Sequence, residues 1–257
     1  METILKITNL AKTYNGGTLA LKDINLEVKN GEFIAVIGPS GAGKSTLLRS
    51  INRLIEPTEG TIEFLNQHIE KVNKNELRKI RSKMGMIFQH YNLIYRSSVL
   101  ENVLHGRLGY MGSLAGVFNR YKEADKREAI MLLEKVGLEA EIYKRADELS
   151  GGQKQRVGVC RALAQIPELI LADEPIASLD PKSSTVVMDA IYKNCKEQGI
   201  ACLVNLHQVD VAKRYATRIV AVKAGTIIFD GEASELTDAM IKYLYEGKEQ
   251  EMLERAN

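Results

Sequence analysis

The sequence predicts an α/β fold in which a largely parallel sheet carries helices on its faces and a helical segment is inserted into the chain. Three observations lead to this fold class. Residues 31–51 have the pattern of an apolar strand, a glycine-rich loop and a helix. After Pro167, strand and helix patterns alternate. Between about residues 89 and 165, strand patterns stop and helical periodicity takes over.

The N-terminal part of the chain predicts two paired strands and then a buried one. Residues 4–10 and 19–28 alternate apolar and polar side chains, and Gly16-Gly17 between them predicts a turn. Residues 31–38, GEFIAVIG, form a nearly continuous apolar run. Such a run is typical of a central strand that is buried on both faces.

The remaining elements follow from the same periodicities. Further strands are expected at 60–65, 84–88, 168–173, 200–206, 218–225 and 226–232, the last two as a closing hairpin. Helices are expected at 44–55, 122–138, 153–165, 183–198 and 209–216. The segment after about residue 236 predicts a polar helix without recognisable chemistry.

Composition excludes several classes of protein. Lys and Arg number 35 against 33 acidic residues, so the net charge of +2 gives no field suited to nucleic acid or an anionic membrane. Apolar or helical surroundings predict that the three cysteines, Cys160, Cys195 and Cys202, are buried reduced thiols, which fits a reducing cytoplasm. We expect no signal peptide, and no stretch approaches the ~18 apolar residues of a membrane helix.

A phosphate-binding loop is predicted between the buried strand and the following helix. The segment matches GxxxxGK[ST] at every fixed position and consists of Gly38, Pro39, Ser40, Gly41, Ala42, Gly43, Lys44, Ser45 and Thr46. Its glycines let successive backbone N–H groups converge on phosphate oxygens, and the helix adds its positive end. We expect Lys44 to reach the terminal phosphates and the Ser45 hydroxyl to bind Mg²⁺. The alternative is a chance glycine-rich turn.

Two carboxylates end the apolar strand at 169–173. Asp173 at the strand tip is a candidate for holding Mg²⁺ through water, and Glu174 is the better candidate for polarising the attacking water. Gln89 and His207 each follow an apolar strand and could assist at the metal and the terminal phosphate. Taken alone, either carboxylate could be a solvated strand end, and the Gln or His an ordinary polar surface residue.

A second anion site is predicted where a helix begins in the inserted segment. Ser150 has the chemistry of a helix N-cap, and Gly151 and Gly152, followed by Gln153, leave backbone N–H groups uncovered there. One nucleotide does not need two such cradles from one chain. The hypothesis is that the second cradle serves a nucleotide on another copy, so that two chains enclose two ATP molecules.

These motifs together resemble the ATP-binding subunit of ABC transporters over nearly the whole chain. The resemblance rests on GPSGAGKST, Gln89, LSGGQKQR, LILADEP, SLD at 178–180 and His207. It implies a P-loop NTPase (RecA-like) core with an antiparallel β subdomain and an inserted α-helical subdomain. The core would be residues 1–88 and 166–257, and residues 89–165 the helical subdomain carrying the signature motif, within a single ABC ATPase domain.

The resemblance also implies roles for single residues. The chain would form a head-to-tail homodimer with ATP and Mg²⁺ in composite sites, where Ser150 and Gly152 contact the opposite γ-phosphate. Glu174, His207 and Gln89 would be catalytic, with Gln89 also a metal ligand. Asp180 would lie at the dimer seam. Tyr14 would stack on adenine, although it could also be an edge-strand tyrosine.

NLHQVD and the segment 106–121, GRLGYMGSLAGVFNRY, look like the subgroup that powers phosphonate import. Phosphate, phosphite or another small polar solute is the alternative. NLHQVD and the PIAS after Glu174 depart from the commoner family patterns without removing a chemical group. A free-standing cassette implies two membrane permease subunits and, indirectly, an external solute-binding protein. The chain would then lie peripherally at the cytoplasmic face of the membrane.

Other functions fit less well. A soluble ABC-type ATPase acting on DNA would carry a long coiled coil, and none is visible between the two glycine motifs. Translation factors of the superfamily carry two cassettes, and the near-neutral charge favours no nucleic-acid partner. An unrelated P-loop kinase or GTPase leaves LSGGQ unexplained. The apolar and aromatic residues of 88–103, among them Tyr91, Leu93, Ile94 and Tyr95, suit a groove for a partner helix or, equally, core packing.

Overall fold

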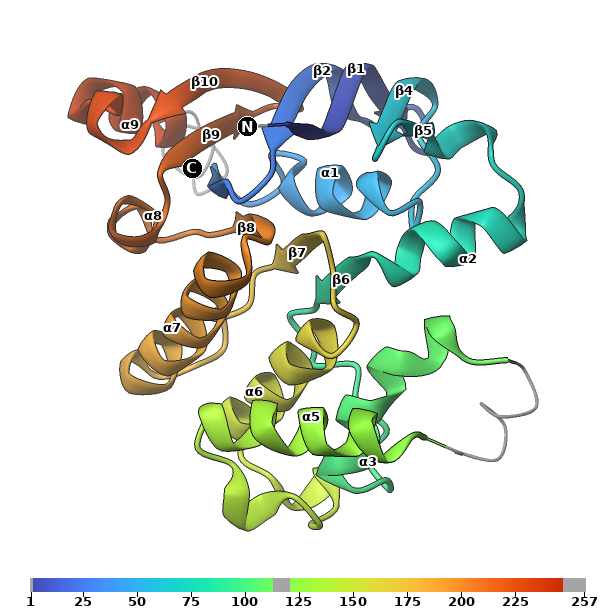
Figure 1. Ribbon diagram of the computed structural model, residues 1–257. Coiled ribbons are helices and arrows are strands. Elements are labelled where there is room, and N and C mark those ends of the chain that lie inside the picture. Colours follow the sequence, from blue (N-terminus) through green and yellow to red (C-terminus); the bar gives the residue numbers. More distant parts are fainter. Residues whose placement is uncertain (1, 113–120, 247–257) are drawn as a thin grey trace. The chain divides into compact units, whose positions relative to one another are not determined.

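The computed structural model describes residues 2–112 and 121–246 (Figure 1). The chain forms two compact units, residues 1–71 with 203–257 and residues 72–202. Each contains both strands and helices, so the predicted α/β class is confirmed. The expected division into a core and a helical subdomain at 88/89 and 165/166 stays a prediction. In the predicted phosphonate-type segment, residues 113–120 lie outside the described residues.

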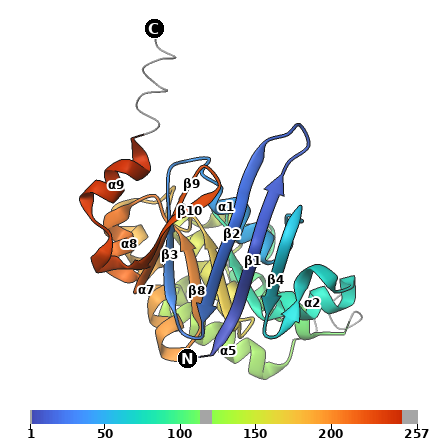
Figure 2. The ribbon, with the colours of Figure 1, turned by 90° about the horizontal axis from the view of Figure 1, so that it is seen from above.

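The first unit contains the expected antiparallel sheet. Its strands lie in the order β2-β1-β4-β5, and β1, β2 and β4 run side by side in Figure 2. Their bounds are β1 (Thr3–Thr13), β2 (Leu19–Lys29), β4 (Glu59–Phe64) and β5 (Gln67–His68). Gly16 and Gly17 have φ of 104° and 83°, the left-handed conformation expected for the turn between β1 and β2. Leu5 and Ile7 alternate along β1 and are buried, and Leu10, which follows a shift in register, is buried as well.

The first unit also contains the strand that leads into the glycine loop. All five residues of β3 (Phe33–Ile37) are buried, and β3 pairs in parallel with β9 (Arg218–Lys223). The predicted closing hairpin is confirmed, because β10 (Thr226–Glu232) pairs antiparallel with β9. The helices of this unit are α1 (Lys44–Ile51), α8 (Val209–Tyr215) and α9 (Asp238–Tyr245), with short 3₁₀ turns at Ile69–Lys71 and Ala233–Glu235.

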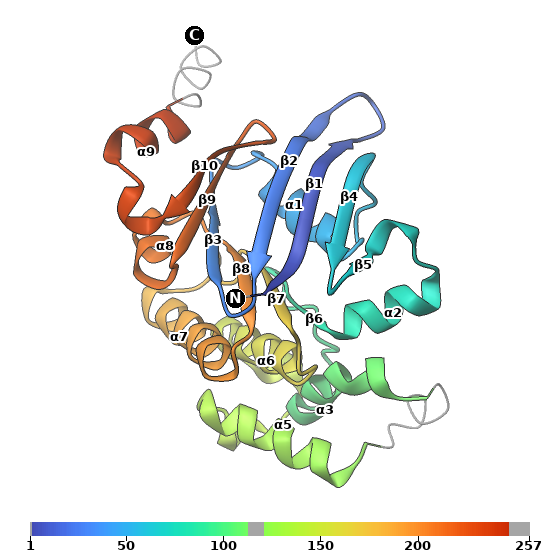
Figure 3. The ribbon, with the colours of Figure 1, turned by 45° about the horizontal axis from the view of Figure 1, so that its top comes forward.

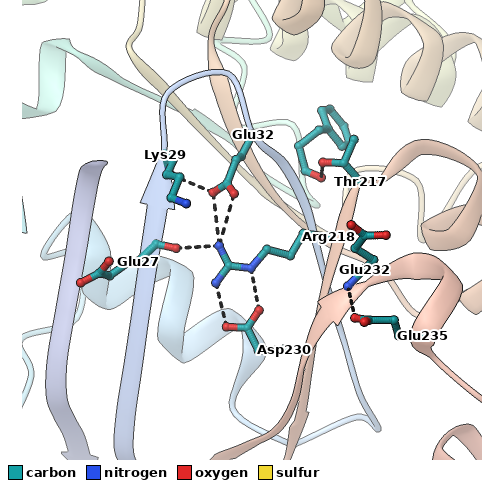
Figure 4. A network of polar contacts seen from close by, with 9 residues as sticks. Glu27, Lys29, Glu32, Thr217, Arg218, Asp230, Glu232 and Glu235 are labelled. Carbon is teal, nitrogen blue, oxygen red and sulfur yellow. Dashed lines mark hydrogen bonds and ion pairs between the residues drawn. The ribbon is translucent and has the colours of Figure 1, made fainter. Parts of the chain in front are cut away.

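Arg218, the first residue of β9, ties several segments of the first unit together (Figure 4). Its Nε and Nη2 donate to the two carboxylate oxygens of Asp230 at 2.6 and 2.8 Å. Its Nη1 donates to the carbonyl oxygen of Glu27 at 2.9 Å and lies 3.3 Å from the carboxylate of Glu32. Asp230 is on β10, Glu27 is on β2, and Glu32 directly precedes β3. The guanidinium therefore links β9 to β10 by a bidentate pair, and to β2 and the residue before β3 through Nη1.

The second unit pairs β6 (Met84–Ile87) in parallel with β7 (Leu169–Asp173). β8 (Ala201–Asn205) begins in this unit and ends in the first. The helices are α2 (Lys74–Ser82), α3 (Val99–Leu104), α5 (Glu123–Lys135), α6 (Gly151–Leu163) and α7 (Pro181–Gln198), with 3₁₀ turns at His105–Tyr110, Glu139–Glu141 and Ala146–Glu148. No element was expected over residues 66–83, where α2 begins with a capping box between Asn73 and Glu76.

Helix α6 is the centre of the second unit, packing against α3, α5, α7 and β6 (Figure 3). Val157, Val159 and Cys160 on this helix are buried. Burial raises the pKa of the Cys160 thiol to about 12. All three cysteines are free and buried, as predicted. Among the described residues, no helix combines the length and the apolar character needed to span a membrane.

Candidate nucleotide-binding site

The glycine loop of the first unit has a backbone that only glycine allows at two positions. Gly38 follows β3 with φ of 150°, and a Cβ there would lie 2.1 Å from the carbonyl oxygen of Val222. Gly43 has φ of 106°, and a Cβ there would lie 2.5 Å from the carbonyl oxygen of Ala20. The loop backbone therefore packs directly against β9 at Gly38 and against β2 at Gly43, which leaves no room for a side chain at either residue.

Helix α1 begins at Lys44, as predicted, with its N-terminus on the loop. Its N-cap is Gly43, which makes no side-chain hydrogen bond to the first amides of the helix. The first turn holds Ser45 and Thr46 and no acidic residue. Amides at a helix start that no side chain caps are suited to an anion, and the helix dipole favours negative charge at the same place.

Lys44 places its ammonium group against the loop. The side chain is 3% exposed, and Nζ donates to the carbonyl oxygens of Gly38 and Pro39 at 2.8 and 3.1 Å. Carbonyl oxygens are weaker partners for an ammonium than phosphate oxygens. The charge is thus held at the loop by bonds that an incoming phosphate can replace.

Tyr14 lies beside the phosphate loop, in the turn after β1. Its hydroxyl is 3.3 Å from Oγ1 of Thr46, and 39% of its surface is exposed. The ammonium of Lys12 lies 5.3 Å from the ring centroid. The predicted aromatic residue is therefore next to the loop with a ring open to solvent. Its stacking on adenine stays a prediction.

His207 follows β8 in the first unit and is exposed. The amide of the preceding Leu206 donates to the carbonyl oxygen of Val36 on β3 at 3.0 Å, which ties this turn to the strand that enters the loop. The hydroxyl of Tyr245 on α9 donates to the carbonyl oxygen of His207 at 3.5 Å. No chemistry was predicted for this tail from the sequence, and Tyr245 was not among the expected residues.

Tyr245 also reaches the phosphate loop. Burial raises the pKa of its phenol, and a hydrogen bond with the backbone of Gly38 acts in the opposite direction. The neighbouring Leu244 is 1% exposed and anchors α9. The apolar positions of 238–245 were the available signal that this helix is packed and not solvated.

The second unit brings Gln89, Asp173 and Glu174 to one edge of its strand pair. Ile87 on β6 pairs with Ala172 on β7, and the strands are parallel. Gln89 follows the end of β6 by two residues, and Asp173 ends β7. Because carboxyl ends of parallel strands meet at the same edge, the amide and the two carboxylates share that edge.

The two carboxylates differ in their surroundings. Asp173 is 1% exposed, whereas Glu174 is partly exposed. Glu174 has φ of 52°, a left-handed conformation that costs a residue with a side chain about 1–3 kcal/mol. Such strain is found at functional sites more often than elsewhere.

The signature segment forms the start of α6, as predicted. Ser150 is the N-cap: its Oγ accepts from the Gln153 amide at 3.3 Å, and its own amide donates to Oε1 of Gln153 at 2.9 Å. This capping box engages both side chains within the motif. Asp180 is the N-cap of α7, where its carboxylate accepts from the Ser183 amide at 3.0 Å, and the hydrogen bonds from Ser183 lower the pKa of its carboxyl group.

The predicted site residues thus fall into two groups, one in each unit. The first unit carries Tyr14, the loop at 38–46 and His207. The second carries Gln89, Asp173 with Glu174, and the signature at 150–153. The first group is suited to bind a chain of phosphates and an aromatic base beside it. The second offers hard oxygen ligands, a carboxylate base and another helix N-terminus.

Comparison with known proteins gives a consistent result. The sequence profile of the ABC transporter family matches residues 21–177. A phosphonates import ATP-binding protein of Oceanobacillus iheyensis is 53% identical over 251 residues, which cover 98% of this chain and 99% of that protein. A protein of the same description from Lactiplantibacillus plantarum is 50% identical over 254 residues, covering 99% of each.

Two solved structures are similar along most of the chain. One is the dimeric post-hydrolysis state of the ATP-binding cassette MJ0796 bound to ADP and Pi. It is 36% identical with a TM-score of 0.79, covering 90% of this chain and 99% of that one. The other is cbiO1 from Clostridium perfringens, part of the ABC transporter complex cbiONQ. It is 30% identical with a TM-score of 0.81, covering 99% of this chain and all of that one (100%).

Proposed function

Because this chain belongs to the ABC transporter family, we propose that it is the ATP-hydrolysing subunit of an importer that takes up a phosphonate. The observation that carries the ATPase assignment is the loop at 38–46, with glycine-only backbone and a buried Lys44 at the start of α1. The solute assignment is supported by two relatives, both phosphonates import ATP-binding proteins, that are 50–53% identical over nearly the whole chain.

ATP binding uses groups of the first unit. The loop amides and the N-terminus of α1 receive the phosphates, while Lys44 exchanges its bonds to two loop carbonyls for bonds to phosphate oxygens. The exposed ring of Tyr14 offers a face for the adenine. His207 is suited to bond the terminal phosphate or to hold Glu174 in place.

Mg²⁺ would be held by the Ser45 hydroxyl, the Gln89 amide oxygen and the Asp173 carboxylate. All three are oxygen donors, the kind that this ion prefers, and the two from the second unit follow paired parallel strands. The bound ion would neutralise charge on the phosphates. Glu174 would accept a proton from the water as its oxygen attacks the γ-phosphorus, the bond to the β–γ bridging oxygen breaks, and ADP leaves.

A second copy of the chain would complete each site. Ser150 and the helix start behind it form an anion site that the chain's own loop does not require. The solved cassette MJ0796 is dimeric with bound ADP and Pi, and it is 36% identical to this chain. We therefore place Ser150 and Gly152 against the γ-phosphate on the partner subunit, with Asp180 at the seam between the copies.

Transport of the solute across the membrane would require membrane-spanning partner subunits. The chain would lie peripherally at the cytoplasmic face, held by two permease subunits, with an external solute-binding protein acting through them. Ile94 and Tyr95 are 54% and 49% exposed and offer an apolar contact for a permease helix. Leu93 is 7% exposed and belongs to the core, so only part of the predicted groove is available.

The test is reconstitution of this subunit in vesicles with its permease and binding protein. The proposal expects ATPase activity that rises when the binding protein is loaded with a phosphonate, and that falls to background in Glu174→Gln. Stimulation by phosphate or phosphite, with none by any phosphonate, would overturn the solute assignment. Full activity of Glu174→Gln would overturn the assignment of the base.

A further inference from the structure

The turn that carries Gln89 is bonded to the signature helix. Gln155 on α6 donates from Nε2 to the carbonyl oxygen of Phe88 at 3.3 Å. Arg161, further along α6, donates from Nη2 to the carbonyl oxygen of Tyr91 at 2.9 Å and from Nη1 to that of Asn92. The main chain on both sides of Gln89 is thus held from one helix.

These bonds fix the orientation of the Gln89 backbone. The carbonyl group of Phe88 and the amide of Gln89 belong to one planar peptide unit, so fixing one fixes the other. Tyr91 and Asn92 have φ of 59° and 50°, left-handed values that cost a residue with a Cβ about 1–2 kcal/mol. A backbone in this conformation must be stabilised by other contacts, and the Arg161 guanidinium provides them by donating hydrogen bonds to the carbonyl oxygens of both residues.

Within the described residues, the hydrogen bond to Phe88 is the only one that the Gln155 side chain makes. Its side chain is 1% exposed, and within the described part of the chain its Oε1 has no hydrogen-bond partner. A buried amide with an unsatisfied oxygen is less stable than an apolar side chain of similar size. The hydrogen bond to Phe88 is the interaction that an apolar residue at this position would lose.

The same turn touches the signature motif directly. A Cβ on Gly151 would lie 3.0 Å from the hydroxyl oxygen of Tyr91, so the phenol rests against the first residue of α6. Ser150, the N-cap, is the next residue back along the chain. The turn is therefore connected to α6 at its start through Tyr91 and further along through Gln155 and Arg161.

We propose that Gln155 and Arg161 are positioning residues that hold the Gln89 turn on α6 and so fix the orientation of Gln89. The proposal rests on the proposed function, in which Gln89 is a Mg²⁺ ligand and Ser150 meets the nucleotide of the partner subunit. Neither positioning residue touches the reacting atoms.

The test compares Gln155→Met and Arg161→Met with a matched control on the same helix. Arg156 also donates to backbone carbonyls, those of Val136 and Gly137 after α5, but makes no bond to the Gln89 turn. Arg156→Met removes an arginine of equal size from α6 without releasing Gln89. Each variant is assayed for ATPase rate against Mg²⁺ concentration and for ATP binding in EDTA.

The expected result is that Gln155→Met and Arg161→Met raise the Mg²⁺ concentration for half-maximal rate by about tenfold or more, since each removes hydrogen bonds that orient a ligand. ATP binding in EDTA should stay within about twofold, because the phosphate loop is unchanged. Arg161→Lys, which keeps a donor, should recover part of the Mg²⁺ response. Arg156→Met should keep the wild-type Mg²⁺ response.

A wild-type Mg²⁺ response in either folded methionine variant would overturn the proposal. Gln155→Met keeps the side-chain size, so it decides the question if Arg161→Met does not fold. Equal shifts in Arg156→Met would also count against it, since they would indicate general damage to α6. Normal turnover by Glu174→Gln would refute the proposed function itself, whereas a dead Glu174→Gln beside unaffected Arg161→Met would refute only the inference.

Discussion

Replacing Gly38 by alanine tests whether the phosphate loop is held by its contact with β9. The added Cβ would lie 2.1 Å from the Val222 carbonyl oxygen, more than 1 Å inside the 3.4 Å at which ordinary contact begins. Overpacking of this kind costs about 1–3 kcal/mol, and an unfavourable positive φ adds about 1–2 kcal/mol. We expect Gly38→Ala to lower the free energy of unfolding by the sum of these two costs, about 2–5 kcal/mol.

Gly41→Ala is the matched control within the same loop. Gly41 has φ of 80°, but a Cβ there meets nothing within 4 Å, so only the conformational cost of about 1–2 kcal/mol remains. The chain has no tryptophan, so urea unfolding without nucleotide is followed by circular dichroism. Equal losses of unfolding free energy in the two variants would refute the claim that the contact with Val222 holds the loop. So would a native-like Gly38→Ala.

Three further predictions concern other parts of the molecule. Lys44→Ala should weaken ATP binding by about 100-fold or more in calorimetry, since it removes the charge held at the loop; unchanged affinity would contradict this. Arg218→Met should lower the free energy of unfolding by about 1–2 kcal/mol, a small value because the guanidinium is partly exposed to solvent. An unchanged urea midpoint would contradict a stabilising role for the bonds that Arg218 makes. Cys160, Cys195 and Cys202 should resist thiol reagents at pH 8 until the protein unfolds, because they are buried and the pKa of Cys160 is raised; rapid labelling of folded protein would contradict this.

Elements with a strong local pattern could be predicted from sequence. The apolar run of β3, the glycines after it and the start of α1 form one continuous signal, and each was found where expected. The hairpin of β9 and β10 follows from two apolar runs separated by Ala224-Gly225, both of which have positive φ. Ser150 as an N-cap follows from its place before the two glycines.

Other features depend on contacts between distant segments. Arg218 bonds to the Glu27 carbonyl across 191 positions, and no local pattern marks that pair. Tyr245 is recognisable only once α9 brings its hydroxyl to the His207 carbonyl. Helix α2 had a readable capping box, Asn73 with Glu76, but its largely charged sequence hid the short apolar stripe.

The candidate site shows the same contrast. The sequence identified Gln89 and Asp173 as residues after apolar strands, but only the register of β6 on β7 brings them to one edge. The left-handed backbone at Glu174, and at Tyr91 in the Gln89 turn, is unusual for residues with large side chains and could not be anticipated from composition. The bonds from Gln155 and Arg161 were likewise invisible, because their partners are backbone carbonyls.

We propose that ATP joins two copies of this chain, so that the phosphate loop of one copy faces the signature motif of the other. The most direct measurement is the mass of Glu174→Gln by light scattering with saturating ATP and Mg²⁺, together with the bound nucleotide per chain. We expect a particle of twice the monomer mass with one ATP per chain, which reverts to monomer when ATP is replaced by ADP. A variant that binds ATP and remains monomeric would contradict it.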